Sequence, residues 1–364
     1  MTQSANLDPD ALKMMSFNVF SKLEGAVTAG MIHLGDTLGL YDELARRTEP
    51  VGVSDLASAL GLHERWVREW ASNQVAARIV SCSDIGDTSM PLYLTAEAKC
   101  VLATPAHPAF GMGMFHRLPQ TMGALNEMPQ SFTTGIGHDY DSHGPEGAVG
   151  IERSFEPWNQ NFLVPTVIPA LEGVKEALEK GTRVADIGCG AGGAAILLAT
   201  TFPSSTVEGY DISKHALERA RQRKAEAGVA NVEFHDPREH GIADDGSYGL
   251  VCTFDCIHDM THPFEMMQTI RRAISPDGTW LLVDIKALDT LEQNISRNPM
   301  APLLYGISVL SCMSSAMSAP DGAGLGTLGL PESRAREMAL AAGFTRFRRL
   351  DVDHSVNAFY EIRP

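Results

Sequence analysis

The sequence predicts an α/β fold in which a mostly parallel, seven-stranded sheet ends in an antiparallel hairpin and follows a smaller α-rich domain. From residue 183 onward, short apolar runs alternate with segments of helical periodicity, as in a parallel sheet covered by helices on both faces. Before residue 106, apolar residues recur at helical spacing and are interrupted by glycine and proline. The 364 residues, 44% of them hydrophobic, suffice for two domains with separate cores.

The α-rich part has the pattern of a winged helix over about residues 30–103. Residues 53–60 and 64–79 predict two helices joined by a short turn. Residues 80–94 contain turn-forming residues between two β-rich runs and fit a hairpin wing. We therefore expect a winged-helix and dimerisation domain within residues 1–105.

Winged helices often bind DNA, and three arginines of the second helix are the candidate contacts: Arg65, Arg68 and Arg78. However, residues 1–105 carry 8 Lys and Arg against 13 Asp and Glu, and the whole chain carries 29 against 45, a formal charge of −16. An acidic protein repels phosphate backbones and anionic lipid. The charge therefore argues against nucleic acid as a partner.

The helices of this domain carry more apolar residues than so small a domain buries by itself. Trp66, Val67 and Trp70 lie close together on the second helix, where they fit either a core or a subunit interface. The surplus predicts a homodimer through the N-terminal domain, because large exposed apolar patches usually mark contact sites.

Residues 106–180 predict a helical connector that also forms the lid of a pocket. The first part is rich in glycine, proline, methionine and histidine and has poor periodicity. Helical spacing returns over residues 155–178, and Gly181 ends that helix just before the first strand. The α/β domain then occupies residues 181–364.

Strands and helices alternate within this last domain. We expect strands at 183–188, 206–210, 232–235, 249–254 and 280–285, and helices at 193–201, 214–228, 263–274 and 332–342. The C-terminal segment contains two further β-rich runs separated by a turn at 354–356, which predict the antiparallel pair at the sheet edge.

The first of these strands leads into a glycine-rich turn, DIGCGAGG, at residues 186–193. Its glycines let a ligand approach the backbone at the carboxyl end of the strand, beside the start of a helix. Asp211 ends the second strand, 25 residues after Asp186, where a carboxylate can accept hydrogen bonds from both hydroxyls of a ribose. The two features together predict a cofactor that contains a nucleoside.

The spacing within the turn separates the cofactor classes. Asp-x-Gly-x-Gly-x-Gly differs from the Gly-x-Gly-x-x-Gly of pyrophosphate-binding turns, and Asp186 disfavours a phosphate nearby. A cationic sulfonium cofactor fits better, with Asp186 acting on its amino group directly or through water. Two alternatives stay open, namely a carboxylate that only orders the turn and a dehydrogenase-like NAD site.

These motifs resemble those of the class I, Rossmann-like S-adenosylmethionine-dependent methyltransferases. VADIGCGAGG and EGYDIS are similar to motifs I and II, EFHD to the third-strand end that meets the adenine amino group, and FDCIHDM to the fourth-strand motif beside the methyl group. The chain from residue 155 onward resembles a bacterial group that also carries an N-terminal winged helix. The resemblance implies S-adenosyl-L-methionine as cofactor and a small-molecule acceptor with an oxygen, sulfur or nitrogen nucleophile. Its cofactor-binding positions fall on Asp186, Gly188, Cys189, Gly190, Asp211, Ile212, Asp236 and Asp255.

His258 is the candidate catalytic residue. It follows the fourth strand at the sheet edge where α/β proteins bind ligands, and an imidazole that is neutral at pH 7 can deprotonate an acceptor. The alternative is a histidine that bonds a neighbouring carboxylate or forms the pocket wall. Asp284, at the end of the fifth strand, either lines the acceptor side or caps the next loop.

Several other classes of function are disfavoured. The six cysteines include no Cys-x-x-Cys pair, so no metal site is predicted. No apolar run reaches the roughly 18 residues of a membrane helix, and we expect a cytoplasmic protein. GLGTLG at 324–329 fits Gly-x-Gly-x-x-Gly, but no convincing strand precedes it, so we expect a structural loop. The competing hypothesis is a winged-helix transcriptional regulator whose methyltransferase-like domain senses a ligand.

Overall fold

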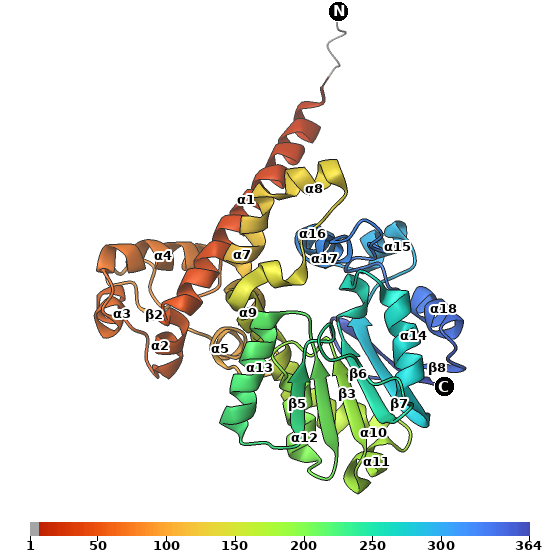
Figure 1. Ribbon diagram of the computed structural model, residues 1–364. Coiled ribbons are helices and arrows are strands. Elements are labelled where there is room, and N and C mark those ends of the chain that lie inside the picture. The colour runs from red at the N-terminus through yellow and green to blue at the C-terminus, as the bar shows by residue number, and fades with distance from the viewer. Residues whose placement is uncertain (1–6) are drawn as a thin grey trace, which may run out of the picture. The chain divides into compact units, whose positions relative to one another are not determined.

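The computed structural model describes residues 7–364 and divides into two compact units, one ending at Leu118 and the other spanning Pro119–Pro364 (Figure 1). The predicted domain ends at residues 105 and 180 remain predictions. The first unit extends past residue 105 because Phe110 and Met112 are buried in its core.

The first unit is a winged helix, as predicted. Its elements are α1 (Pro9–Thr37), α2 (Leu40–Arg46), α3 (Val53–Leu60), α4 (Glu64–Ala76), β1 (Ser81–Cys82), β2 (Leu92–Tyr93), α5 (Ala96–Ala103) and α6 (Met112–His116). Strands β1 and β2 pair antiparallel as the wing. Gly61 has φ of +66° and ends α3 in the left-handed conformation, which starts the turn into α4.

The two tryptophans of α4 have different environments. Trp70 is buried, packs against Tyr41 and donates its Nε1–H to the carbonyl of Met31 at 2.9 Å. Trp66 lies one turn earlier in the helix, with 79% of its surface exposed. Of these two tryptophans, Trp66 is the one that is exposed within the first unit.

The second unit contains a seven-stranded sheet with strand order β5-β4-β3-β6-β7-β9-β8. Its strands are β3 (Arg183–Ile187), β4 (Thr206–Tyr210), β5 (Val232–His235), β6 (Tyr248–Phe254), β7 (Ile274–Ile285), β8 (Arg346–Arg349) and β9 (Asn357–Arg363). The first five are parallel, whereas β9 pairs antiparallel with both β7 and β8. The predicted mostly parallel sheet with a C-terminal antiparallel hairpin is confirmed.

Helices cover both faces of this sheet (Figure 1). The helices between and after the strands are α12 (Gly193–Thr201), α13 (Lys214–Ala227), α14 (Pro263–Ala273), α15 (Leu291–Arg297), α16 (Ala301–Leu310), α17 (Cys312–Ala316) and α18 (Glu332–Ala341). Successive residues of a strand point to opposite faces of the sheet. Val184 packs with α12 and α13 on one face, whereas Ala185 packs with α14 and α18 on the other.

The segment before the sheet is more broken than predicted. It contains α7 (Leu118–Gly123), η1 (Ala124–Asn126), α8 (Met128–Thr134), η2 (Tyr140–His143), α9 (Gly144–Trp158), the π-helical η3 (Asn159–Val167), α10 (Ile168–Ala170) and α11 (Val174–Lys180). The single helix expected over residues 155–178 is therefore wrong. Pro157 and Pro165 remove backbone donors, and Gly173, at φ +72°, separates α10 from α11.

Within residues 7–364, no helix combines the length and the apolar character required to cross a membrane.

Candidate active site

The turn between β3 and α12 needs its glycines. Gly188, Gly190 and Gly192 have φ of +71°, +54° and +75°, a region that other residues rarely adopt. A Cβ on Gly188 would also lie 2.6 Å from the Cβ of Cys256. The glycines thus let the turn pack closely against neighbouring side chains while part of it lines a cavity.

Asp186 lies at the end of β3 and lines that cavity with Gly188, Cys189 and Gly190. Its side chain is 1% exposed, and neither carboxylate oxygen has a close hydrogen-bond partner. Burial, followed by the nearby Asp211, raises the pKa of Asp186 to about 7, and the backbone N–H of Ala195 offsets only part of this effect. A buried carboxylate without a partner favours a cationic or hydrogen-bond-donating ligand beside it.

Helix α9 and the first residue of η3 line the cavity, within the segment predicted to form a lid, although the sequence singled out none of their residues. Glu156 and Asn159 line it, and Arg223 of α13 forms an ion pair with Glu156 at 2.7 Å. Glu152 pairs in the same way with Arg219 at 2.7 Å. The sequence signal for this contact is weak, because two acidic or two basic residues four apart give each helix a charged face without specifying the partner helix.

Asp211 ends β4 and is bonded to the glycine turn. Its two carboxylate oxygens accept the backbone N–H groups of Gly190 and Ser213, each at 2.8 Å. Burial raises the pKa of Asp211, and these amides only partly offset that effect. The carboxylate thus joins the ends of the first two strands, where the sequence placed it.

Ile212 and Asp236 lie next to each other at the ends of β4 and β5. Arg238 connects them, since it forms an ion pair with Asp236 and donates to the carbonyl of Ile212 at 2.7 Å. Hydrogen bonding by Arg238 lowers the pKa of Asp236. Asp236 is therefore engaged by a guanidinium, a partner that the sequence motif did not reveal.

His258 lies in a turn of 3-10 helix, η4 (Ile257–Asp259), just after β6. Its Nδ1 lies 2.7 Å from Oδ1 of Asp284, and both side chains are only 2% exposed. With Nδ1–H donated to the carboxylate, Nε2 is the nitrogen left for other partners.

The pKa of His258 depends on burial and on two neighbouring side chains. Burial lowers the pKa of His258, but Asp284 and the nearby Cys312 outweigh it and hold the pKa well above its usual value. The neighbouring carboxylate therefore favours the charged form of His258, and its role as a base stays a prediction.

Asp255 lies with the His258–Asp284 pair. Its φ is +49°, and its carboxylate accepts a hydrogen bond from the amide of Asn357 at 2.5 Å. Burial and the charge of Asp284 raise its pKa to about 7. Asp255 is not among the residues that line the cavity beside Asp186.

The loop containing residues 324–329 supports η4 instead of binding a nucleotide. Gly326 donates its backbone N–H to the carbonyl of His258 at 3.1 Å, and Ala323 donates to the carbonyl of Thr261 at 2.9 Å. A helix, α17, precedes the loop where a nucleotide-binding turn would require a strand.

Comparison with known proteins identifies both parts of the chain. Residues 178–316 match the model of a methyltransferase domain, and residues 26–101 match the model of an Rv2258c-like winged HTH domain. The chain belongs to the class I S-adenosylmethionine-dependent methyltransferases. The family and the cofactor class predicted from the glycine turn are thereby confirmed.

Relatives of this methyltransferase cover part of its length. The ubiquinone biosynthesis O-methyltransferase of Paracidovorax citrulli is 26% identical over 42% of this chain and 59% of its own. The 27-O-demethylrifamycin SV methyltransferase of Amycolatopsis mediterranei is 33% identical over 29% of this chain and 40% of its own. The chain thus spans about half the length of these two relatives.

Solved structures share the fold over almost the whole methyltransferase chain. Mitomycin 7-O-methyltransferase MmcR has a TM-score of 0.67 at 20% identity, covering 98% of this chain and 99% of its own. Human N-acetylserotonin methyltransferase, solved with S-adenosylmethionine, has a TM-score of 0.65 at 15% identity, covering 100% and 99%. At these identities the likeness establishes the fold.

The residues present fit the methyltransferase cofactor. The carboxylate of Asp186 suits a cationic amino group, and the backbone at Gly190 has open space beside it. Asp211 provides a second carboxylate beside the same turn. S-adenosylmethionine, when bound, supplies an electrophilic methyl group.

Proposed function

We propose that the chain transfers the methyl group of S-adenosylmethionine to a small molecule that carries an oxygen, sulfur or nitrogen nucleophile. The observation that supports this most is the buried, partnerless carboxylate of Asp186 in a glycine-lined cavity. The eight cofactor-binding residues predicted from the sequence belong to this proposal. The relatives that methylate hydroxyl groups favour oxygen among the three acceptor atoms.

In this proposal His258 takes the proton of the acceptor at Nε2. Asp284 holds the ring by accepting Nδ1–H and stabilises the positive charge that develops on the imidazole. The positive sulfonium of the bound cofactor repels the positive charge of a protonated His258. Cofactor binding therefore lowers the pKa of His258 and favours the neutral imidazole, which can accept a proton.

Most of the acceleration comes from alignment of the two reactants. The attacking atom must face the methyl group in line with the breaking bond, in a site from which water is excluded. The chain contributes a rigid edge of parallel strands, which carry Asp186, Asp211 and Asp284 at their ends. No covalent enzyme intermediate is required.

We also propose a homodimer through the N-terminal domain. Helix α1 is 29 residues long, and most of its large apolar side chains are exposed. The exposed set is Leu12, Met14, Met15, Phe17, Val19, Phe20, Leu23, Val27 and Leu34. A second copy of the helix provides a surface of the same apolar character, and burying both would remove these side chains from water.

The regulator hypothesis receives less support. On α4, Arg65 pairs with Glu69 at 2.5 Å and Arg68 pairs with Glu64 at 2.7 Å, so neither arginine presents an isolated positive charge. A DNA-binding helix usually presents a basic face. Saturable, sequence-selective DNA binding at physiological salt would reverse this preference.

The proposed reaction is tested by measuring S-adenosylhomocysteine across a panel of phenols, alcohols, thiols and amines. We expect product only when both S-adenosylmethionine and one class of acceptor are present. Binding of NAD without binding of S-adenosylmethionine would replace this proposal with a dehydrogenase-like function.

A further inference from the structure

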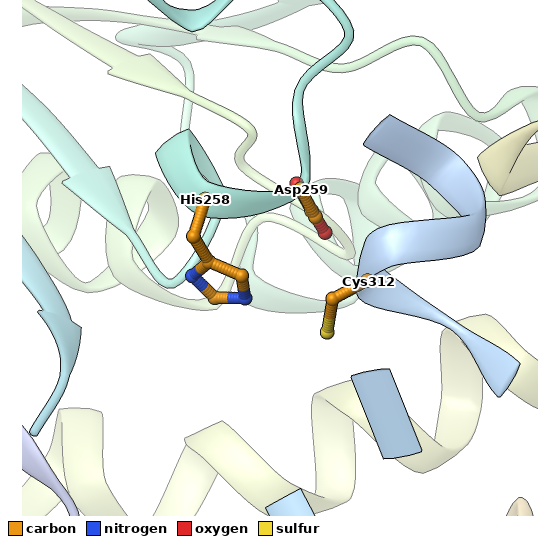
Figure 2. A group of neighbouring side chains, drawn as sticks. All are labelled: His258, Asp259 and Cys312. Carbon is orange, nitrogen blue, oxygen red and sulfur yellow. The ribbon is translucent and has the colours of Figure 1, made fainter. Parts of the chain in front are cut away.

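A second group of reactive side chains adjoins the proposed base. His258, Asp259 and Cys312 each offer one ligand atom, and these atoms all lie within 4.8 Å of one another. Figure 2 shows the outer ring nitrogen of His258 and the carboxylate of Asp259 on the side that faces the sulfur of Cys312. We name these three residues the His-Asp-Cys cluster.

The fold brings the cluster together from two separate segments. His258 and Asp259 lie in η4, whose carbonyl at His258 is held by the backbone N–H of Gly326. Cys312 begins α17, directly after the interruption at Ser311 that separates α17 from α16. Both segments belong to the second unit, so the arrangement does not depend on the placement of the first.

The chemistry of the cluster is that of a metal site. Asp284 accepts Nδ1–H of His258 at 2.7 Å and leaves Nε2 as the nitrogen nearest the cluster, from which a bound ion displaces the proton. A carboxylate behind a histidine is the usual outer partner of a zinc ligand, because it orients the ring and increases its basicity. Imidazole nitrogen, thiolate sulfur and carboxylate oxygen are all zinc ligands.

Access and charge fit the same ion. His258 is buried, whereas Asp259 and Cys312 are partly exposed, so a cation can enter from their side. The carboxylate of Asp284 lies directly behind His258, at 2.7 Å from Nδ1. A thiolate together with an imidazole selects zinc over magnesium or calcium, which prefer oxygen ligands.

We propose that His258, Asp259 and Cys312 form a binding site for Zn²⁺. Zinc–ligand bonds of about 2.0–2.3 Å require a modest closure of the three ligand atoms around the ion. Three protein ligands leave the fourth position open. The effect of Zn²⁺ on catalysis rests on the proposed function, in which Nε2 of His258 accepts the proton of the substrate. An ion bound to Nε2 prevents this step, so Zn²⁺ should inhibit methyl transfer.

The test measures metal binding directly on the full chain. Reduced, chelator-treated protein is titrated with Zn²⁺ against a chromophoric competitor, and we expect one equivalent to bind. Cys312→Ala and Cys312→Ser should abolish this stoichiometric binding, and Asp284→Asn should weaken it about 10–100-fold. Cys100→Ala, a partly buried cysteine of α5, is the matched control and should bind Zn²⁺ as the wild type does.

Co²⁺ provides a second readout that reports the ligands. A thiolate-to-cobalt charge-transfer band should appear in the wild type and be absent from both Cys312 variants, whose folding is checked by thermal unfolding. Absence of stoichiometric Zn²⁺ binding by the wild type, or equal binding by folded Cys312→Ala, would overturn the proposal. Because these measurements require no methyl transfer, their failure is distinguishable from failure of the proposed reaction.

Discussion

Nδ1 of His258 lies 2.7 Å from Oδ1 of Asp284, and both side chains are almost completely buried. The two residues lie at the ends of neighbouring strands, β6 and β7, so the pairing is a consequence of the parallel sheet. Because the carboxylate occupies Nδ1, any proton removed from an acceptor must go to Nε2.

His258→Ala should lower turnover by about 10²-fold or more while the affinity for S-adenosylmethionine stays nearly unchanged, because a general base typically contributes 10²–10⁴-fold. Single-turnover kinetics and calorimetry measure the two effects separately. His262→Ala, a more exposed histidine of the same loop, is the control and should keep wild-type turnover. Equal losses of cofactor affinity and turnover would assign His258 to the cofactor pocket.

Asp211→Ala should weaken S-adenosylmethionine binding by about tenfold to a hundredfold, because a hydrogen bond to a charged group contributes roughly 1.5–3 kcal/mol. The substitution also frees the backbone N–H of Gly190, which Asp211 holds at 2.8 Å. Calorimetry measures the affinity, with Asp277→Ala, an exposed carboxylate near the start of β7, as the control. Unchanged affinity would exclude Asp211 from the cofactor site.

Affinity for S-adenosylmethionine should fall by about tenfold between pH 8 and pH 6 through Asp186, whose pKa in the free protein is about 7. Below that pH the carboxyl is neutral and no longer attracts a cation, so protonation weakens binding. Calorimetry at both pH values tests this, and Asp186→Asn should bind weakly at both. A wild-type affinity independent of pH, or a variant that keeps the full dependence, would contradict the role of Asp186.

The wild-type protein should have about twice the chain mass of 39.3 kDa in light scattering at micromolar concentration. The double substitution Phe17→Asp and Phe20→Asp should return it to a monomer. Both side chains are exposed on α1, and a dimer through this helix would have to bury two charged carboxylates in each chain. Ile85→Asp, which alters an 82% exposed apolar residue of the wing, is the control. A wild-type monomer would contradict the proposed dimer.

Local patterns determined much of this protein. Strand positions followed from short apolar runs, and the glycine turn was predicted because positive φ at Gly188 and Gly190 demands that residue type. Asp186 and Asp211 were predictable as neighbours, since the carboxyl ends of parallel strands meet at one edge of the sheet. These features depend on residues that are close in sequence or on the general geometry of the fold.

Tertiary packing decided the rest. The contact of α9 with the glycine turn depends on ion pairs between helices 67 residues apart in sequence, and no local periodicity specifies such a partner. Cys312 lies near His258 because the helix is interrupted at Ser311, between α16 and α17. The pKa of His258 and the lack of close partners at Asp186 both depend on how deeply these side chains are buried and on which atoms surround them. Segments distant in the sequence contribute those atoms.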